Sequence, residues 1–330
     1  MLRSGTPAEP FVPATDAPVS FTPATDAPVP LVPAATGTPL PLVPAVTDTP
    51  VPLPQPASVR TIAFSDFDET YLAHAPTPAR IADREALEDY LAEAVSRHGL
   101  LFGWVTGSSL VSVLEKVRAH GLRTLPHFVA CSLGTELLVT DGHELRPEPG
   151  WQRRLPSPAD VTARADTVVR ELAAQGVALE LQPGRAPDSL VKSFYHYSRD
   201  PDADARALAR VAPVAARFGL AAQTNRCNPG AGDPEDAYDV DLLPPGCGKR
   251  HIVDHVCALH GVDPADAFAF GDSGNDLEML AAVGHGLLVG NGTQEARERH
   301  PQVSERLYAD AVLTALRAGL DHDHAGKGLK

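Results

Sequence analysis

The sequence predicts an α/β protein in which a parallel sheet covered by helices carries an inserted α+β unit and follows a proline-rich tail. Three observations predict this. Strand and helix patterns alternate over residues 58–150 and again over 244–330. Two strand patterns follow each helix pattern between residues 151 and 243. A proline-rich period of ten fills residues 1–57. Strand–helix alternation is typical of a Rossmann-like sheet with helices on its faces.

The first 57 residues differ in composition from the rest. The segment 11–20 is repeated with small changes at 21–30, a decaying third copy begins at residue 31, and 15 of the 32 prolines lie before residue 57. Proline lacks a backbone donor and disfavours helix at the residue before it. We therefore expect residues 1–57 to be an extended, disordered tail. A docking site for a partner is the alternative.

The elements of the parallel sheet follow from short apolar runs, each succeeded by a helical pattern. The first part is expected to contain strand 59–65, helix 83–98, strand 100–105, helix 109–120, strand 127–131 and hairpin strand 133–139. The second is expected to contain a helix from Lys249, strand 266–270, a helix after Asn275, strand 286–290 and two final helices. Together, 58–150 and 244–330 would form one core domain.

Residues 151–243 predict a separate cap domain of order αββαββ with an antiparallel sheet. The expected elements are helix 159–175, strands 177–182 and 190–197, helix 203–218, and strands 219–225 and 237–243. Paired strands after each helix fit an antiparallel arrangement better than a parallel one.

Composition excludes several function classes. The net charge of −14 and pI near 5.3 argue against nucleic acid or an anionic membrane as partner, because both require a basic surface. No apolar run reaches transmembrane length, and no secretory signal follows the start. The four cysteines form no C-x-x-C pair, so free thiols in the cytoplasm are expected. The sequence does not set the oligomeric state.

Polar residues follow three of the predicted parallel strands. Asp66 and Asp68 end the first strand, Thr106 and Gly107 the second, and the segment 271–276 the third. Because carboxyl ends of parallel strands meet at one edge of the sheet, we expect these groups to converge, with Lys249 at a nearby helix start. Alone, Asp66 could be a nucleophile, a metal ligand or a turn residue.

A converged set of carboxylates would carry strong mutual repulsion. Hard oxygen ligands favour Mg²⁺, which also binds phosphate oxygens. An aspartate nucleophile is known chemistry for phosphoryl transfer, where positioning and charge neutralisation dominate catalysis. Phosphoryl chemistry is thus the interpretation that uses the whole set.

With these residues in place, the sequence resembles the haloacid-dehalogenase-like hydrolase superfamily. Its four motifs match Asp66-Phe-Asp-Glu-Thr70, Thr106-Gly107, Lys249 and Gly271-Asp-Ser-Gly-Asn-Asp276. The inserted unit is similar to the type C2B cap of the sugar-phosphatase branch, which includes sucrose-phosphate phosphatases. Further similar stretches are 103–109, 126–128, 133–136, 225–229, 232–236 and 238–241. The resemblance covers most of residues 59–320 and leaves the tail without a counterpart.

The resemblance implies a role for each motif residue. Asp66 would be the nucleophile, and Asp68 the general acid and base, which dehalogenases lack. Mg²⁺ would be bound by the carboxylates of Asp66 and Asp272 and by the backbone carbonyl of Asp68. The phosphoryl group would be held by Thr106, Gly107, Lys249 and Asn275. Asp276 would orient Lys249 or a metal-bound water.

The implied substrate is a sugar 6-phosphate, with kanosamine 6-phosphate in antibiotic biosynthesis as the first expectation. An ammonium group on the sugar would favour a carboxylate in the cap. The candidate sugar contacts are Tyr195, Tyr197, Arg226, Asn228, Asp233, Glu235 and Asp236. Because positions 195–197 alternate along a strand, at least one of Tyr195, His196 and Tyr197 should face the interior of the cap.

Three alternatives stay open at this point. The enzyme could act on another hexose phosphate or on sucrose phosphate. It could be a phosphomutase that returns the phosphoryl group. The chain could instead be an interaction protein that uses its proline-rich tail and keeps an inactive phosphatase fold.

Overall fold

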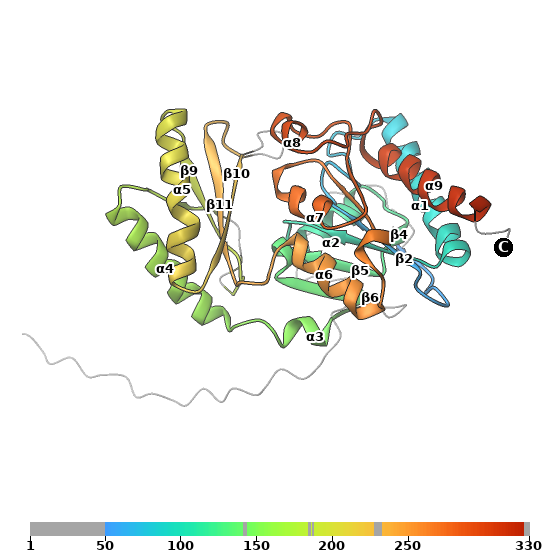
Figure 1. Cartoon of the computed structure of the whole chain (residues 1–330), viewed down its shortest axis with the longest axis horizontal. Helices are drawn as coiled ribbons and strands as arrows, with labels where there is room; N and C mark the ends of the chain where they lie inside the picture. The colour runs from blue at the N-terminus through green and yellow to red at the C-terminus, as the bar shows by residue number, and fades with distance from the viewer. Residues whose placement is uncertain (1–49, 141–143, 184–185, 187, 228–232, 327–330) are drawn as a thin grey trace, which may run out of the picture.

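The computed structural model describes residues 50–140, 144–183, 186, 188–227 and 233–326 (Figure 1). Residues 1–49, most of the predicted tail, lie outside this range. Two main sheets are present, one of seven strands and one of four. The predicted class, a parallel α/β core with an inserted α+β unit, is confirmed.

The large sheet has the strand order β13-β12-β2-β3-β5-β6-β7. All neighbours from β13 to β5 are parallel, whereas β6 and β7 extend one edge in antiparallel fashion. The bounds are β2 Thr61–Ser65, β3 Leu100–Val105, β5 Phe128–Cys131, β6 Glu136–Thr140, β7 Leu145–Pro147, β12 Phe268–Gly271 and β13 His285–Leu288.

Helices cover both faces of the large sheet, and alternation along the strands explains how. In β2, Ala63 packs toward α1, α2 and α9, whereas Ile62 and Phe64 pack toward α6 and α7. The helices are α1 Pro78–His98, α2 Leu110–Ala119, α3 Pro149–Gln152, α6 Lys249–His260, α7 Leu277–Ala281, α8 Gln294–Arg299 and α9 Tyr308–Gly326. Short 3₁₀ turns are η1 Ser132–Gly134, η3 Pro264–Asp266 and η4 Gly274–Asp276.

Two predicted boundaries move for local reasons. Helix α1 begins at Pro78 rather than at residue 83, because the Thr77 side chain caps it and Pro78 suits the first helical position. The hairpin strand predicted at 133–139 begins only at Glu136. The residues before it turn instead, with Ser132 and Leu133 at φ 50° and 52°.

The small sheet, called the cap sheet below, has the antiparallel order β10-β11-β9-β8. Its strands are β8 Glu180–Leu181, β9 Lys192–Tyr197, β10 Ala221–Arg226 and β11 Ala237–Leu243. Helices α4 Pro158–Ala174 and α5 Pro201–Arg217 cover the face turned away from the large sheet (Figure 1). Strand β8 covers only part of the strand predicted at 177–182.

One face of the cap sheet is apolar and the other polar. Phe194, Val240 and Leu242 pack with the buried residues of α4 and α5. His196, on the same face of β9 as Phe194, contacts the Ala178 carbonyl at 3.0 Å. The expectation that one of residues 195–197 faces the cap interior is thus confirmed for His196.

The segment 50–57 is ordered, which corrects the prediction that the tail is disordered up to residue 57. Strand β1 (Val51–Pro52) pairs in parallel with β4 (Thr124–Leu125). Leu53 is only 3% exposed and belongs to the main core cluster. Proline disfavours helix but still permits a short edge strand. The buried side chain of Leu53 holds this strand in place.

No helix in the described ranges combines the length and apolar character needed to cross a membrane.

Replacing Leu53 should destabilise the fold although the residue lies in the proline-rich segment. We expect Leu53→Ala to lower the free energy of unfolding by about 2–5 kcal/mol, since a buried leucine is lost from the core. Val51→Ala, a change at a side chain that is 66% exposed, should cost less than about 0.5 kcal/mol. Urea unfolding of the two variants measures this, and equal effects would show that Leu53 does not anchor the segment.

Candidate active site

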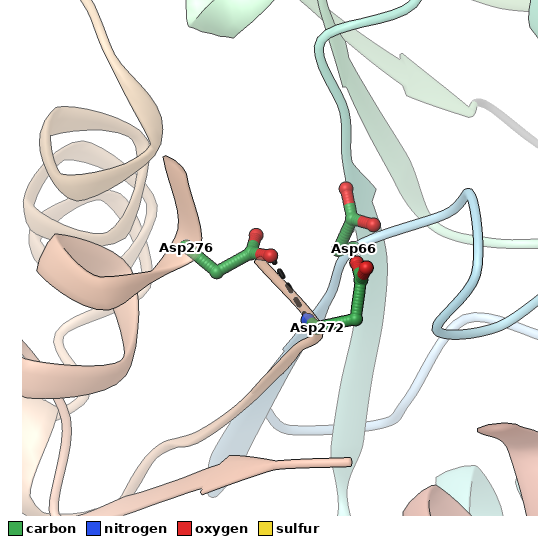
Figure 2. A group of neighbouring side chains, drawn as sticks. All are labelled: Asp66, Asp272 and Asp276. Atoms are coloured by element: carbon green, nitrogen blue, oxygen red, sulfur yellow. Dashed lines mark hydrogen bonds between the residues drawn. The ribbon is translucent and has the colours of Figure 1, made fainter. Parts of the chain in front are cut away.

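Three carboxylates come together at the ends of β2 and β12. The backbone amide of Asp66 donates to the carbonyl of Phe270 at 2.8 Å, which ties the two strand ends. One carboxylate oxygen from each of Asp66, Asp272 and Asp276 lies within 4.8 Å of the others, and all three residues are buried (Figure 2). Asp66 directly follows β2, Asp272 directly follows β12, and Asp276 lies in η4.

Close backbone approach at Gly271 makes this packing possible. A Cβ at Gly271 would lie 2.4 Å from Cγ of Asp276, so only glycine fits there. The freed space lets the Asp276 carboxylate accept hydrogen bonds at 3.0 Å from the amides of Asp272 and Ser273. The first of these is drawn in Figure 2. Asp276 thus fixes the turn that presents Asp272.

Lys249 places a single ammonium among the carboxylates. It is the first residue of α6, after Gly248, whose φ of 118° favours glycine. Its Nζ donates to Oδ1 of Asp66 and to Oδ1 of Asp276, each at 2.6 Å, with only 2% of its side chain exposed. Burial opposes the charge, yet the carboxylates of Asp276 and Asp66 hold the pKa of Lys249 above its usual value.

The three carboxylates outnumber the one ammonium. Burial, reinforced by the charges of Asp276 and Asp68, raises the pKa of Asp66 to about 7. Burial and the neighbouring Asp66 and Asp276 raise the pKa of Asp272 well above its usual value. A buried site with this excess negative charge and hard oxygen donors fits a divalent cation.

This carboxylate group contains Asp276 where the predicted metal set had Asp68. The Asp68 side chain is turned to other partners: Oδ1 lies 2.5 Å from Lys116 Nζ and 2.7 Å from His74 Nε2, and Ser108 Oγ donates to Oδ2 at 2.7 Å. Burial opposes them, but these partners together hold the pKa of Asp68 well below its usual value. The role predicted for the Asp68 backbone carbonyl stays a prediction.

The predicted phosphate-binding residues border the same site. Thr106 is buried at the end of β3, and its Oγ1 accepts from the amide of Ser108 at 3.0 Å. Gly107 and Asn275 line the cavity above the carboxylates, together with Thr106. Lys249 is not among the residues that line the cavity, but its ammonium contacts Asp66, which is.

The cavity measures about 1990 Å³ and has walls from both sheets. On the cap side, Asp239 pairs in register with Tyr195 on one neighbouring strand and with Asn225 on the other. Asp241 lies two residues further along β11 and therefore points to the same face of the cap sheet. The cap residues that line the cavity include Gln182, Tyr195, Asn225, Arg226, Cys227, Asp233, Asp239 and Asp241.

Asp239 is a cap carboxylate with close polar partners in the cavity wall. Its Oδ1 accepts from Gln182 Nε2 at 2.7 Å and from Cys227 Sγ at 3.4 Å. Burial, with the charges of Asp233 and Asp241, raises its pKa to about 6. A carboxylate crowded in this way favours a cationic neighbour.

The predicted sugar contacts divide into two groups. Tyr195, Arg226 and Asp233 line the cavity, and the Tyr195 hydroxyl donates to Asp233 at 3.3 Å. The guanidinium of Arg226 stacks on Tyr238 and donates to the carbonyl of Glu235. The remaining described candidates, Tyr197, Glu235 and Asp236, are exposed and are not among the lining residues, and Asn228 lies outside the described residues.

Sequence reasoning missed several lining residues. The alternation of polar Asp239 and Asp241 with apolar Val240 and Leu242 is visible in the sequence and could have identified the cavity face of β11. For Lys116, the only sequence feature that points to the site is its place on the helix after Thr106-Gly107. No sequence feature points to His74, because its position depends on how the loop after β2 folds.

Comparison with known proteins agrees with this geometry. The profile of the family described as sucrose-6F-phosphate phosphohydrolase matches residues 59–318. The chain belongs to this family. A Bacillus subtilis kanosamine-6-phosphate phosphatase is 36% identical over 258 residues, which cover 78% of this chain and 91% of that protein. Membership makes the chain a phosphoric monoester hydrolase and argues against an inactive interaction protein.

Solved structures show the same fold. A haloacid dehalogenase-like hydrolase from Bacillus subtilis matches with a TM-score of 0.63 and 34% identity, covering 82% of this chain and 95% of that one. The sucrose-phosphatase from Synechocystis sp., solved with sucrose and phosphate, matches with a TM-score of 0.60 and 18% identity, covering 79% and 98%. The predicted resemblance to haloacid-dehalogenase-like sugar phosphatases is confirmed.

Stability of the metal-free phosphohydrolase should depend on pH through Asp66. Its pKa is raised from 3.8 to about 7 in the fold, so the folded state keeps a proton that the unfolded state has lost. We expect the free energy of unfolding of the wild type, measured relative to Asp66→Asn in EDTA, to fall as pH rises through this window. Urea unfolding at a series of pH values measures it.

Two controls accompany that titration. Asp166→Asn, at an exposed position of α4, should give a difference from wild type that does not change with pH. Added Mg²⁺ should restore the stability of the wild type at neutral pH, because a ligand of the folded state stabilises it. A difference between wild type and Asp66→Asn that is independent of pH would contradict the charge crowding.

Proposed function

We propose that the chain hydrolyses the phosphate ester of a hexose 6-phosphate with the help of Mg²⁺, and that kanosamine 6-phosphate is the first candidate substrate. The observation that carries the proposal is a carboxylate–ammonium site at the floor of a cavity whose opposite wall bears further carboxylates. The kanosamine-6-phosphate phosphatase at 36% identity supports the same substrate. An antibiotic-biosynthesis role follows from that substrate.

The residues present suit Mg²⁺. We propose that the carboxylates of Asp66 and Asp272 and the backbone carbonyl of Asp68 hold it, because they are hard oxygen donors in a site with excess negative charge. When bound, the ion would supply positive charge beside the phosphoryl oxygens. Asp276 is engaged by Lys249 and by two backbone amides, so we assign it the orienting role.

The reaction would proceed in two displacements. Because its partners favour the ionised form, Asp68 must take up a proton before it can act as the acid. A carboxylate oxygen of Asp66 then attacks phosphorus, the bond from phosphorus to the sugar oxygen breaks, and Asp68 gives that proton to the sugar oxygen. Asp68 then takes a proton from water, whose oxygen attacks phosphorus and displaces Asp66. Thr106, Gly107, Lys249 and Asn275 hold the phosphoryl oxygens throughout, and Asp66 is regenerated.

The cap side of the cavity would select the sugar. An ammonium on the hexose ring suits a pocket whose wall contains Asp233, Asp239 and Asp241, because charge-assisted hydrogen bonds are the strong ones. Of these, Asp233 belongs to the predicted sugar contacts, whereas Asp239 and Asp241 do not. We propose that residues 151–243 act as the cap domain and that 58–150 and 244–330 form the catalytic core.

Two other reactions would contradict this proposal and can be tested against it. A phosphatase for another hexose phosphate or for sucrose phosphate would use the same core, and a phosphomutase would return the phosphoryl group to the sugar. A reducing compartment such as the cytoplasm suits the chain, because all four cysteines are buried free thiols.

A phosphate-release screen tests the proposed reaction. Wild type with Mg²⁺ should hydrolyse kanosamine 6-phosphate faster than glucose 6-phosphate, glucosamine 6-phosphate or sucrose 6-phosphate, and EDTA should abolish the activity. Asp66→Asn should lose at least about 10³-fold in kcat, because the nucleophile is gone. Substantial turnover by that variant would refute the role of Asp66, and indifference to EDTA would refute that of the metal.

Selectivity for an amino sugar should depend on Asp239. We expect Asp239→Asn to lower the ratio of kcat/KM for kanosamine 6-phosphate over glucose 6-phosphate by about 10- to 100-fold, since a hydrogen bond to a charged group contributes about 1.5–3 kcal/mol. Asp236→Asn, at an exposed position outside the cavity lining, is the matched control. An unchanged ratio in Asp239→Asn would assign selectivity elsewhere.

The same ratio should depend on pH. With a pKa of about 6, Asp239 is ionised at pH 7 and protonated at pH 5, so the ratio should fall as the pH is lowered between them. The phosphate group titrates alike in both substrates and cancels. Loss of this pH dependence in Asp239→Asn would confirm that Asp239 causes the change in the kcat/KM ratio.

A further inference from the structure

Three side chains without an assigned role hold the Asp68 carboxylate. Lys116 Nζ donates to Oδ1 at 2.5 Å and Ser108 Oγ donates to Oδ2 at 2.7 Å. Lys116 Nζ also donates to Ser108 Oγ at 3.3 Å. The contacts close a ring in which both carboxylate oxygens are engaged, and His74 Nε2 adds a contact to Oδ1 at 2.7 Å.

The ring joins segments that are separate in the chain. Lys116 lies on α2, Ser108 lies between β3 and α2, and His74 lies in the loop after β2. That loop is fixed in turn by Glu69, whose Oε1 accepts from the backbone amide of His74 at 2.8 Å. All of these residues line the cavity, so the ring faces the space that a substrate would occupy.

We propose that Lys116 is a positioning residue that, through Ser108 and with His74, fixes the Asp68 carboxylate for proton transfer to the leaving oxygen. This inference rests on the proposed function, in which Asp68 is the general acid. A carboxylate after a strand end can rotate about two side-chain torsions, and proton transfer needs one defined position. Two donors on different oxygens, bridged by one ammonium, restrict that rotation while Asp68 is ionised. The proton that Asp68 later gives to the leaving oxygen must take the place of one of these contacts.

Lys116 is better suited to this task than to direct phosphate binding. Its ammonium is already engaged by Asp68 and Ser108, and 27% of its side chain is exposed. The buried ammonium close to the carboxylate set is that of Lys249 instead. Loss of Lys116 should therefore affect departure of the leaving group more than binding of the phosphoryl group.

Leaving groups of different basicity separate these roles. The experiment uses the full-length chain with Mg²⁺ and compares p-nitrophenyl phosphate, phenyl phosphate and glucose 6-phosphate in the first turnover. p-Nitrophenolate departs as an anion, whereas phenolate and a sugar alkoxide increasingly need a proton. We expect Lys116→Met to slow cleavage of glucose 6-phosphate by about 100-fold and of p-nitrophenyl phosphate by less than about 3-fold.

Two further variants sharpen the result. Arg118→Met, at an exposed position of the same helix, should leave all three rates unchanged. Lys116→Arg keeps a cationic donor and should recover part of the rate for the basic leaving groups. Because each comparison is a ratio of rates in one preparation, a reduced amount of folded variant cancels.

Several outcomes would overturn the inference. Equal losses for all leaving groups in Lys116→Met would indicate a structural or phosphate-binding role, and unchanged rates would indicate none. A raised KM with unchanged kcat would indicate direct contact with substrate. Failure of the wild type on sugar phosphates would refute the proposed function alone, because the comparison of phenyl with p-nitrophenyl phosphate still decides the role of Lys116.

Discussion

The ammonium of Lys249, buried between Asp66 and Asp276, is the interaction on which the site depends. Removing its charge would leave two buried carboxylates without their cation, at a cost of several kcal/mol. The helix that supplies it, the end of β2 that presents Asp66 and the turn η4 that holds Asp276 must therefore meet at one edge of the sheet. The excess of carboxylates that remains gives this edge its affinity for a cation, so one buried ion pair links the fold to the chemistry.

Catalytic and selective groups are supplied by different parts of the chain. The large sheet delivers Asp66, Asp272 and Thr106 at its strand ends, and the segments that follow these strands deliver Asp276 and the ring around Asp68. The cap sheet delivers carboxylate, amide and phenol groups from strand interiors, at a spacing of two residues. The first set suits any phosphate ester, whereas the second meets the part of the substrate that varies.

The sequence predicts the core site well because its logic is local. Asp66, Thr106 and Asp272 each follow a recognisable apolar strand, and parallel strands put such positions at one edge. It predicts the cap side poorly, because the cavity face of a strand is decided by which side the helices cover. The sequence does not identify Lys116 for a related reason. Its partner Asp68 lies 48 residues earlier, and only tertiary packing brings the two side chains together. Leu53 shows the converse, since a proline-rich composition concealed an ordinary buried anchor.

The two-faced cap sheet has a consequence for how new substrates arise in evolution. Its apolar face, packed on α4 and α5, carries the burden of folding, whereas side chains such as Tyr195, Asp239 and Asp241 contribute little to that packing. Substitutions on the cavity face therefore alter recognition without opening voids in a hydrophobic core. A lineage could exchange one sugar for another through a few such changes while the hydrolytic machinery stays untouched, which makes this surface a natural starting point for directed evolution.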